Sequence, residues 1–349
     1  MSTEFSKILT LWYLGNKRDL PWRKTKDPYV IWLSEIILQQ TRVSQGLPYF
    51  LAFVERFPNV ELLANAPEEE VLKMWQGLGY YSRARNLHAA AKMVVDNFQN
   101  KFPNTYNDLI KLKGVGVYTA SAIASFSNNE SVAVVDGNVY RVLSRIYGVF
   151  TPINSTEGEK EFRKLAKDLL DDENAGEHNQ AIMEFGALAC TPKKVSCESC
   201  PFNNSCYAYI NNAVEELPVK LKKTKVRKRY FNFLVVKMGD KTFLQKRLGK
   251  GIWQNMYQFP MIETEGILAS VEANELVSNL GMGIIRYGLV SRLEKPHKLS
   301  HQHIYADFYE LEVKDGAFVD DSYVKMKFGE VEKYPVPVLI SNFLEDYVF

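Results

Sequence analysis

The chain has 349 residues, of which 46% are hydrophobic and 24% are charged, and its formal net charge at pH 7 is +2. Such a chain is large enough for two globular domains and a third small module, and its charge neither favours nor excludes nucleic acid as a partner. The first twelve residues include Glu4 and Lys7 and lack the pattern of a signal peptide, and no uninterrupted apolar stretch is long enough to span a bilayer. The composition therefore predicts a cytoplasmic protein without a membrane partner.

The first half of the chain is predicted to be all-α. Residues 5–209 read as short amphipathic helices separated by proline, glycine, asparagine and aspartate. One helix is expected to begin at Asp27-Pro28, because aspartate is a favoured N-cap residue and proline suits the first helical position. Its apolar side chains recur with a period near 3.6 residues and predict one buried face: Tyr29, Trp32, Leu33, Ile36 and Ile37. Further helices are expected at residues 68–75, 85–98, 117–126, 139–147 and 159–170.

The composition changes after Pro218. Residues 220–229 contain seven lysines and arginines and no acid, which is typical either of a solvated linker or of a linker that also contacts phosphates. Beyond this run, short segments rich in aromatic and β-branched residues predict strands, and one helical window is expected at residues 267–280. The second half is therefore predicted to be α+β, with strands at residues 230–236, 242–245, 284–289, 304–313 and 325–329.

All four cysteines lie within 17 residues of the chain. Cys190, Cys197, Cys200 and Cys206 have the spacing C-x6-C-x2-C-x5-C. Four thiolates on one short loop can surround a single compact metal centre. Zinc is the main alternative, although structural zinc sites usually show two C-x2-C pairs, and disulfides are not expected in a chain without an export signal.

Two glycines and an aspartate form a second pattern. Gly114 and Gly116 form a G-x-G turn ahead of the small-residue segment 120–124. Glycines let the backbone turn sharply and bring free N–H groups to a helix N-terminus, where they can hold a phosphate. The turn alone is common in helix–turn–helix joints. Asp136 follows twenty residues later, at a position where a carboxylate can cap the next helix and remain ionised.

Glu35 is the only acid in an otherwise apolar helix. Ile31 and Leu38 are its neighbours on the helix surface. Desolvation by such neighbours would raise the pKa of the carboxyl toward the range that suits a proton donor. The alternative is an ordinary glutamate on a solvated face.

Together these segments resemble the MutY adenine DNA glycosylases, within the helix–hairpin–helix, endonuclease III superfamily. The resemblance covers nearly all of residues 1–217. It rests on Leu20-Pro21-Trp22-Arg23, on the Glu35 helix through Gln39-Gln40-Thr41-Arg42, on residues 77–86, on the glycine hairpin with Asp136, and on the cysteine loop. It implies a catalytic domain at residues 1–217 that holds a [4Fe–4S] cluster on the loop 190–206, and a basic linker at residues 218–229.

The resemblance also implies a mechanism. An adenine must be flipped out of the duplex before it can be reached. Glu35 is expected to protonate the adenine at N7, and Asp136 to stabilise the oxocarbenium-like sugar, with Tyr118 and Asn138 supporting them. Trp22, Arg23 and Gln180 are expected to surround the adenine. Gln40 and Tyr80 are expected to wedge into the stack, with further DNA contacts from Thr41, Leu78, Gly114 and Gly116.

Tyr118 bears on the type of reaction. Endonuclease III and its bifunctional relatives carry a lysine nucleophile at this place on the hairpin. A phenol cannot form the Schiff base that strand cleavage requires, and Lys113 lies before the turn. The sequence therefore predicts a monofunctional glycosylase that leaves an abasic site.

Residues 230–349 resemble the Nudix-like domain of the same family. Gly251-Ile252-Trp253 followed by Gln258-Phe259-Pro260 carries this likeness, and the acidic run that a working Nudix hydrolase needs does not follow Gly251. In the family this domain reads 8-oxoguanine through a loop that ends in Ser-His, which Ser300-His301 matches. Leu299 replaces the usual aromatic residue, so a weaker wedge is expected. A metal site formed by His297, His301 and His303 is a less favoured interpretation.

These observations predict a cytoplasmic monomer that acts at the bacterial nucleoid. Its expected partner is double-stranded DNA with 8-oxoguanine:adenine or guanine:adenine mismatches. Two alternatives remain open at this stage. One is a bifunctional thymine-glycol-type glycosylase and lyase, and the other is a cluster-bearing DNA-binding or redox-sensing protein without catalysis. Glu35 argues against the second, because a binding module gains nothing from burying an unpaired acid.

Overall fold

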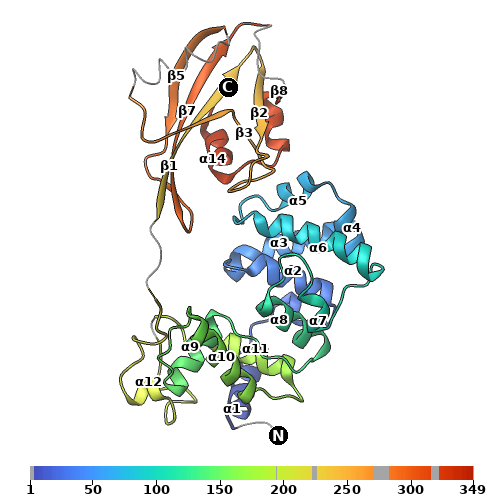
Figure 1. The fold of residues 1–349 in the computed structure, drawn as a ribbon, viewed down its shortest axis with the longest axis vertical. Helices are drawn as coiled ribbons and strands as arrows, with labels where there is room; N and C mark the ends of the chain where they lie inside the picture. Colours follow the sequence, from blue (N-terminus) through green and yellow to red (C-terminus); the bar gives the residue numbers. More distant parts are fainter. Residues whose placement is uncertain (1–3, 194, 222–225, 270–282, 316–321, 349) are drawn as a thin grey trace. The chain divides into compact units, whose positions relative to one another are not determined.

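The structure is a computed structural model that describes residues 4–193, 195–221, 226–269, 283–315 and 322–348. The chain divides into two compact units (Figure 1). The first unit consists of Met1–Asn65 and Asn86–Lys222, and the second consists of Ala66–Arg85 and Lys223–Phe349. Most of the helical window expected at residues 267–280, and part of the basic run 220–229, lie outside the described residues.

The first unit is all-α, as predicted. In Figure 1 its helices run from dark blue at the N-terminus to yellow-green. They are α1 (Glu4–Asn16), the short 3-10 helix η1 (Pro21–Arg23), α2 (Pro28–Leu38), α3 (Val43–Arg56), α4 (Val60–Asn65), the part of α6 (Ser82–Phe98) that follows Arg85, α7 (Tyr106–Leu109), α8 (Val117–Asn128), α9 (Gly137–Tyr147), α10 (Thr156–Leu169), α11 (Ala175–Leu188) and α12 (Tyr207–Ile210).

Helix α2 begins where the sequence predicted. Asp27 is its N-cap, with a side-chain oxygen that accepts a hydrogen bond of 2.9 Å from the Tyr29 backbone N–H, and Pro28 is the first helical residue. The predicted apolar face of α2 is buried, and the burial extends beyond it. Helices α3 and α8 and η1 all pack on α2, so every residue from Ile31 to Ile37 is buried. The local period could not reveal this, because packing on several sides is a property of the tertiary structure.

Helix α11 is the second central element. It packs against α1, α8 and α9. The core on one side of it is a cluster of apolar side chains from α1, α9, α10 and α11, which includes Leu9, Val142, Phe162, Ala181 and Phe185. Because α2 and α11 both pack against α8, residues far apart in sequence are brought to the walls of a common cavity.

The second unit is α+β, as predicted. One sheet has the order β4-β1-β7-β5, with β6 also paired to β7, and a second sheet has the order β3-β2-β8. Its elements are α5 (Glu68–Met74), β1 (Arg227–Lys237), β2 (Lys241–Lys246), β3 (Tyr257–Gln258), β4 (Met261–Thr264), β5 (Ile284–Arg292), β6 (His297–Lys298), β7 (Gln302–Val313), β8 (Tyr323–Lys327), the 3-10 helix η2 (Phe328–Lys333) and α14 (Val338–Asp346).

Strands β1 and β7 form the centre of the larger sheet. They run parallel, with Arg227 opposite Gln302 and Lys237 opposite Glu312. Phe233 stacks on Phe308 with ring centroids 5.0 Å apart, and Phe308 stacks on Phe343 of α14 at 4.0 Å. Strand β6 pairs antiparallel with the start of β7, so that residues 299–301 form the turn of a short hairpin. No helix in the described part of the chain is long and apolar enough to cross a membrane.

Candidate active site

Glu35 lies in the middle of α2, and its side chain is buried, with a relative exposure of 8%. The phenol of Tyr118, from the first turn of α8, donates a hydrogen bond of 2.8 Å to its Oε2. Burial raises the pKa of Glu35 to about 7; the bond from Tyr118 and the charge of Arg23 oppose the rise, and the charge of Asp136 adds to it. The carboxyl can therefore both hold and release a proton near neutral pH.

Asp136 is the N-cap of α9. Its Oδ1 accepts hydrogen bonds from the backbone N–H groups of Asn138 and Val139 at 2.9 and 2.8 Å. Its Oδ2 accepts a bond of 2.7 Å from the side-chain amide of Asn138. Burial raises the pKa of Asp136 and outweighs these bonds, which lower it. The capping role that the sequence indicated is confirmed, and the cap fixes the orientation of the carboxylate.

Both carboxyl groups line one cavity of about 620 Å³ in the first unit. This volume is within the range of small-molecule pockets. The cavity brings together eight of the residues singled out from the sequence: Trp22, Arg23, Glu35, Thr41, Tyr118, Asp136, Asn138 and Gln180. Gln40 does not line it. That residue is exposed and has a left-handed backbone conformation, with φ of 55°, directly after the end of α2.

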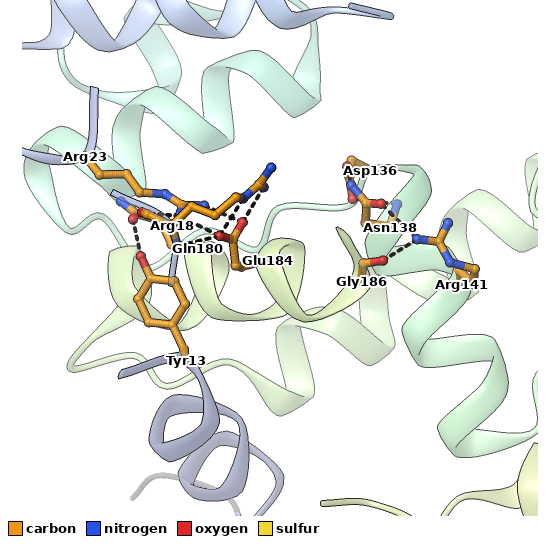
Figure 2. A network of polar contacts seen from close by, with 9 residues as sticks. All are labelled: Tyr13, Arg18, Arg23, Asp136, Asn138, Arg141, Gln180, Glu184 and Gly186. Carbon is orange, nitrogen blue, oxygen red and sulfur yellow. Dashed lines mark hydrogen bonds and ion pairs between the residues drawn. The ribbon is translucent and has the colours of Figure 1, made fainter. Parts of the chain in front are cut away.

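One wall of the cavity is an ion-pair network that the sequence did not reveal (Figure 2). Glu184, on α11, accepts hydrogen bonds from the guanidinium groups of both Arg18 and Arg23. Beside it, Tyr13 donates a bond of 2.7 Å to the side-chain oxygen of Gln180. Glu184 follows Gln180 by four residues in an apolar segment, and this helical spacing was the signal that could have identified it.

A second network links Asp136 and Asn138 to Arg141 and Gly186 (Figure 2). Arg141 Nη2 donates to Asn138 Oδ1 at 2.9 Å and to the Gly186 carbonyl at 2.6 Å. Its Nε donates to the Cys190 carbonyl at 2.7 Å. A chain of hydrogen bonds thus connects the backbone of the cysteine loop to the amide that holds Asp136 Oδ2.

The four cysteines line a cavity of about 300 Å³ beside α9 and α11. Cys190 and Cys206 are buried, and Cys197 and Cys200 are half-buried. Arg145 Nη1 lies 3.5 Å from Cys190 Sγ, and burial raises the pKa of the Cys200 thiol to about 11. In the described residues, no group of three or more His, Cys, Asp or Glu side chains is arranged to hold a single metal ion. The four cysteines line one cavity, and the metal centre that their spacing predicted stays a prediction.

The glycine hairpin has the geometry that its sequence indicated. Gly114 has a φ of +75°, and a Cβ at this position would lie 2.6 Å from the Asn86 Cβ. Only glycine satisfies both conditions without strain. Gly116 is the N-cap residue of α8. Neither glycine lines the cavity that holds Glu35.

A further cavity of about 770 Å³ lies within the second unit. Its walls come from residues 77–85 and from the second half of the chain, and they include four predicted residues: Leu78, Tyr80, Ser300 and His301. The hydroxyl groups of Tyr80 and Ser300 are hydrogen-bonded to each other. Tyr80 is 46% exposed, with a left-handed φ of 48° that turns the chain between Gly79 and Tyr81.

Comparison with known proteins identifies the family. Residues 33–168 match the model of the HhH-GPD superfamily base excision DNA repair proteins, and residues 232–346 match the NUDIX domain. An adenine DNA glycosylase of Buchnera aphidicola subsp. Schizaphis graminum is 38% identical over 262 residues, which cover 75% of this chain and 76% of the relative. The chain belongs to the adenine DNA glycosylase family.

Other relatives agree with this assignment. The adenine DNA glycosylase of Buchnera aphidicola subsp. Baizongia pistaciae is 36% identical over 303 residues, which cover 86% of this chain and 84% of the relative. A solved thermostable thymine-DNA glycosylase superposes with a TM-score of 0.56 at 29% identity, covering 59% of this chain and 95% of the other. The family and the fold class that the motifs predicted for this adenine DNA glycosylase family member are confirmed.

Proposed function

We propose that the protein excises adenine mispaired with 8-oxoguanine or guanine from double-stranded DNA. The observation that carries this proposal is the buried Glu35, whose pKa of about 7 suits a proton donor and which shares a cavity with Asp136. The assignment of the chain to the adenine DNA glycosylase family supports it.

The chemistry follows from the two carboxyl groups. Glu35 donates its proton to N7 of the extruded adenine, which makes the base a better leaving group. Tyr118 donates to Oε2 of Glu35, so it orients the acid during the transfer. Asp136, fixed by the N-terminus of α9 and by Asn138, provides negative charge beneath the sugar as positive charge develops there.

Three residues are proposed to recognise the base. A guanidinium group has five N–H groups, and the bonds to Glu184 and to the Arg18 carbonyl use three of those of Arg23. The remaining two can donate to ring nitrogens of adenine. The side-chain oxygen of Gln180 already accepts a bond from Tyr13, so its NH₂ group is the one left for the base. Trp22 contributes an apolar wall.

The reaction is proposed to be hydrolysis without strand cleavage. A lyase needs an amine that can form a Schiff base with the sugar. Among the described residues that line the cavity there is no lysine, and the hairpin carries Tyr118 instead. Water is therefore the proposed nucleophile, and an abasic site is the product.

The cavity of the second unit is the proposed site for the base opposite adenine. Ser300 and His301 offer hydrogen-bonding groups on the β6–β7 turn, and Leu78 and Tyr80 also line this cavity. Leu299, on the same turn as Ser300, cannot stack as an aromatic ring would, so the wedge is proposed to come mainly from Tyr80 and from Gln40 of the first unit. Thr41, Gly114 and Gly116 are further proposed DNA contacts.

The cysteine loop is proposed to hold a [4Fe–4S] cluster. The residues fit this group, because four thiols line one hollow of about 300 Å³, with Arg145 beside Cys190 to offset negative charge. When bound, the cluster would fix the fold of the loop, and the proposed reaction involves no electron transfer.

The test is excision from a labelled duplex with one 8-oxoguanine:adenine pair. We expect breaks in the adenine strand only after hot alkali, and no protein–DNA adduct on borohydride reduction. A guanine:adenine duplex is the comparison substrate, and an adenine:thymine duplex is the negative control. Breaks without alkali would contradict the monofunctional assignment, and intact adenine in both mispaired duplexes would contradict the function itself.

A further inference from the structure

Glu184 is a buried carboxylate of the cavity wall, with an exposure of 1%. It lies on α11, one helical turn after Gln180. Its Oε1 accepts from the backbone N–H and the Nε of Arg18 at 2.9 and 2.8 Å, and from Nη1 of Arg23 at 2.9 Å. Its Oε2 accepts from Nη2 of each arginine, at 2.5 Å for Arg18 and 2.8 Å for Arg23.

This carboxylate stays ionised across the working pH range. Burial alone would raise the pKa of Glu184, but the hydrogen bonds from Arg18 and Arg23 outweigh burial and hold the value at about 2. This part of the cavity wall therefore carries the positive charges of Arg18 and Arg23 and the negative charge of Glu184. Charge-assisted bonds of this kind are stronger than neutral ones and restrict both guanidinium planes.

The hydrogen bonds that Arg23 donates to Glu184 fix the orientation of its guanidinium group. Arg23 lies on η1, 161 residues from Glu184 in sequence, and its side chain is mostly buried, over the ring of Tyr13 at 5.7 Å. Both of its terminal nitrogens donate to Glu184. Without Glu184 these two bonds would be lost, and the guanidinium could rotate toward the carboxyl of Glu35.

We propose that Glu184 is a positioning residue of the adenine pocket: it fixes the guanidinium groups of Arg18 and Arg23 in the wall and offsets their positive charge beside the proton donor Glu35. This inference rests on the proposed adenine excision. Nothing in the motifs that define the sequence resemblance includes Glu184. Its carboxylate accepts hydrogen bonds from Arg18 and Arg23, and in this proposal it acts through these two arginines.

The electrostatic part of the proposal concerns all groups that face Glu35. Arg23 comes from η1, Tyr118 from α8 and Asp136 from the N-cap of α9. Arg18, Arg42 and Glu184 complete the charged lining of the cavity. Loss of the Glu184 charge leaves the guanidinium charges uncompensated, and positive charge favours the ionised form of Glu35. Glu35 would then lose its proton at a lower pH, and the proton donor would be depleted near neutrality.

The experiment compares Glu184→Gln with the control Glu157→Gln. Glu157 is an exposed glutamate in the first turn of α10, and it does not line the cavity that holds Glu35. Single-turnover excision from the 8-oxoguanine:adenine duplex is followed from about pH 5 to about pH 9 with the full-length protein. For Glu184→Gln we expect the alkaline limb of the profile to move down by roughly half to one pH unit, and the plateau rate to fall by roughly tenfold or more. The control should superpose on the wild-type profile.

Arg18→Gln supplies the opposite perturbation. It removes one cation and leaves Glu184 paired with Arg23, so the alkaline limb should move to higher pH. Glu184→Asp, which keeps the charge on a shorter side chain, should restore the wild-type limb with a lower plateau. If Glu184→Gln does not fold, Arg18→Gln and Glu184→Asp still test whether the charges of this network set the pH at which Glu35 loses its proton.

Several outcomes would overturn the proposal. A Glu184→Gln protein with the wild-type rate and limb would show that the arginines need no partner. A slower variant with an unmoved limb and a lower melting temperature would mean that Glu184 only ties η1 to α11. If the alkaline limb of the pH–rate profile does not move in Arg18→Gln, the guanidinium charges do not act on Glu35 as proposed. If the wild-type protein leaves adenine intact, the proposed function fails, and this failure is separate because it precedes every variant.

Discussion

Replacement of Glu35 by glutamine tests the central acid, because it keeps the shape of the side chain and removes its titration. The variant should fold, since a glutamine oxygen can still accept the hydrogen bond from Tyr118. It should excise adenine roughly a hundredfold to ten-thousandfold more slowly, which is the usual contribution of a positioned proton donor. In the wild-type protein the rate should be highest below about pH 7 and fall about tenfold per pH unit above it, because only protonated Glu35 can act.

The same change should stabilise the protein at alkaline pH. The pKa of Glu35 is about 7 in the folded chain, against 4.5 for an ordinary glutamate. As pH rises, the unfolded chain releases this proton first, so folding loses stability between about pH 4.5 and about pH 7. The shift corresponds to about 3 kcal/mol, which is the full penalty above pH 7. Glu35→Gln removes the penalty, so the variant should be more stable than the wild type at about pH 8 by up to about 3 kcal/mol.

Two assays on the same preparations separate these effects. Single-turnover excision with alkali treatment measures the rate, and thermal unfolding at about pH 5 and about pH 8 measures the stability. Glu61→Gln is the control, because Glu61 is an exposed glutamate in the first turn of α4. Stabilisation should be seen for Glu35→Gln, should be larger at the higher pH, and should be absent for Glu61→Gln. A Glu35→Gln protein that excises adenine at the wild-type rate, or that melts below the wild type at both pH values, would refute the reasoning.

Three further changes test the other parts of the site. Asp136→Asn keeps an oxygen that can cap α9, so the free energy of unfolding should change by about 1 kcal/mol or less. The excision rate should fall by roughly a hundredfold or more. A large loss of stability in thermal melting followed by circular dichroism, alongside the loss of rate, would contradict this prediction. Ser300→Ala should reduce the preference for 8-oxoguanine over guanine opposite adenine by roughly tenfold, because it removes the hydroxyl that bonds to Tyr80, and a loss shared equally by both duplexes would argue for a structural role. Cys200→Ser should lower the iron content per protein in elemental analysis and lower the melting temperature, whereas unchanged iron would show that the loop does not hold the cluster.

Features that depend on neighbouring residues could be predicted from the sequence. The N-caps at Asp27 and Asp136 involve backbone groups two or three residues away, so residue type and position were sufficient. The left-handed conformation of Gly114 follows from its place in a G-x-G turn. The cysteine spacing brought four thiols onto one short loop, and the change in composition after Pro218 marked the passage from helices to strands.

Features that depend on residues far apart in the chain could not be predicted from the sequence. The sequence marked one apolar face of α2 and left open whether Glu35 is desolvated or solvated; the packing of α3, α8 and η1 on α2 decided this and raises the pKa of Glu35. The hydrogen bond that Tyr118 donates to Glu35 joins positions 83 residues apart, and the bonds that Arg18 and Arg23 donate to Glu184 join positions more than 160 residues apart. Local spacing could have suggested Glu184 as a neighbour of Gln180, but not its partners. The sequence by itself determined the helix caps, the turns and the set of reactive groups, since these are governed by residues close along the chain. The tertiary structure alone decided which charges meet and how deeply they are buried, because desolvation and ion pairing arise only when separate helices pack together.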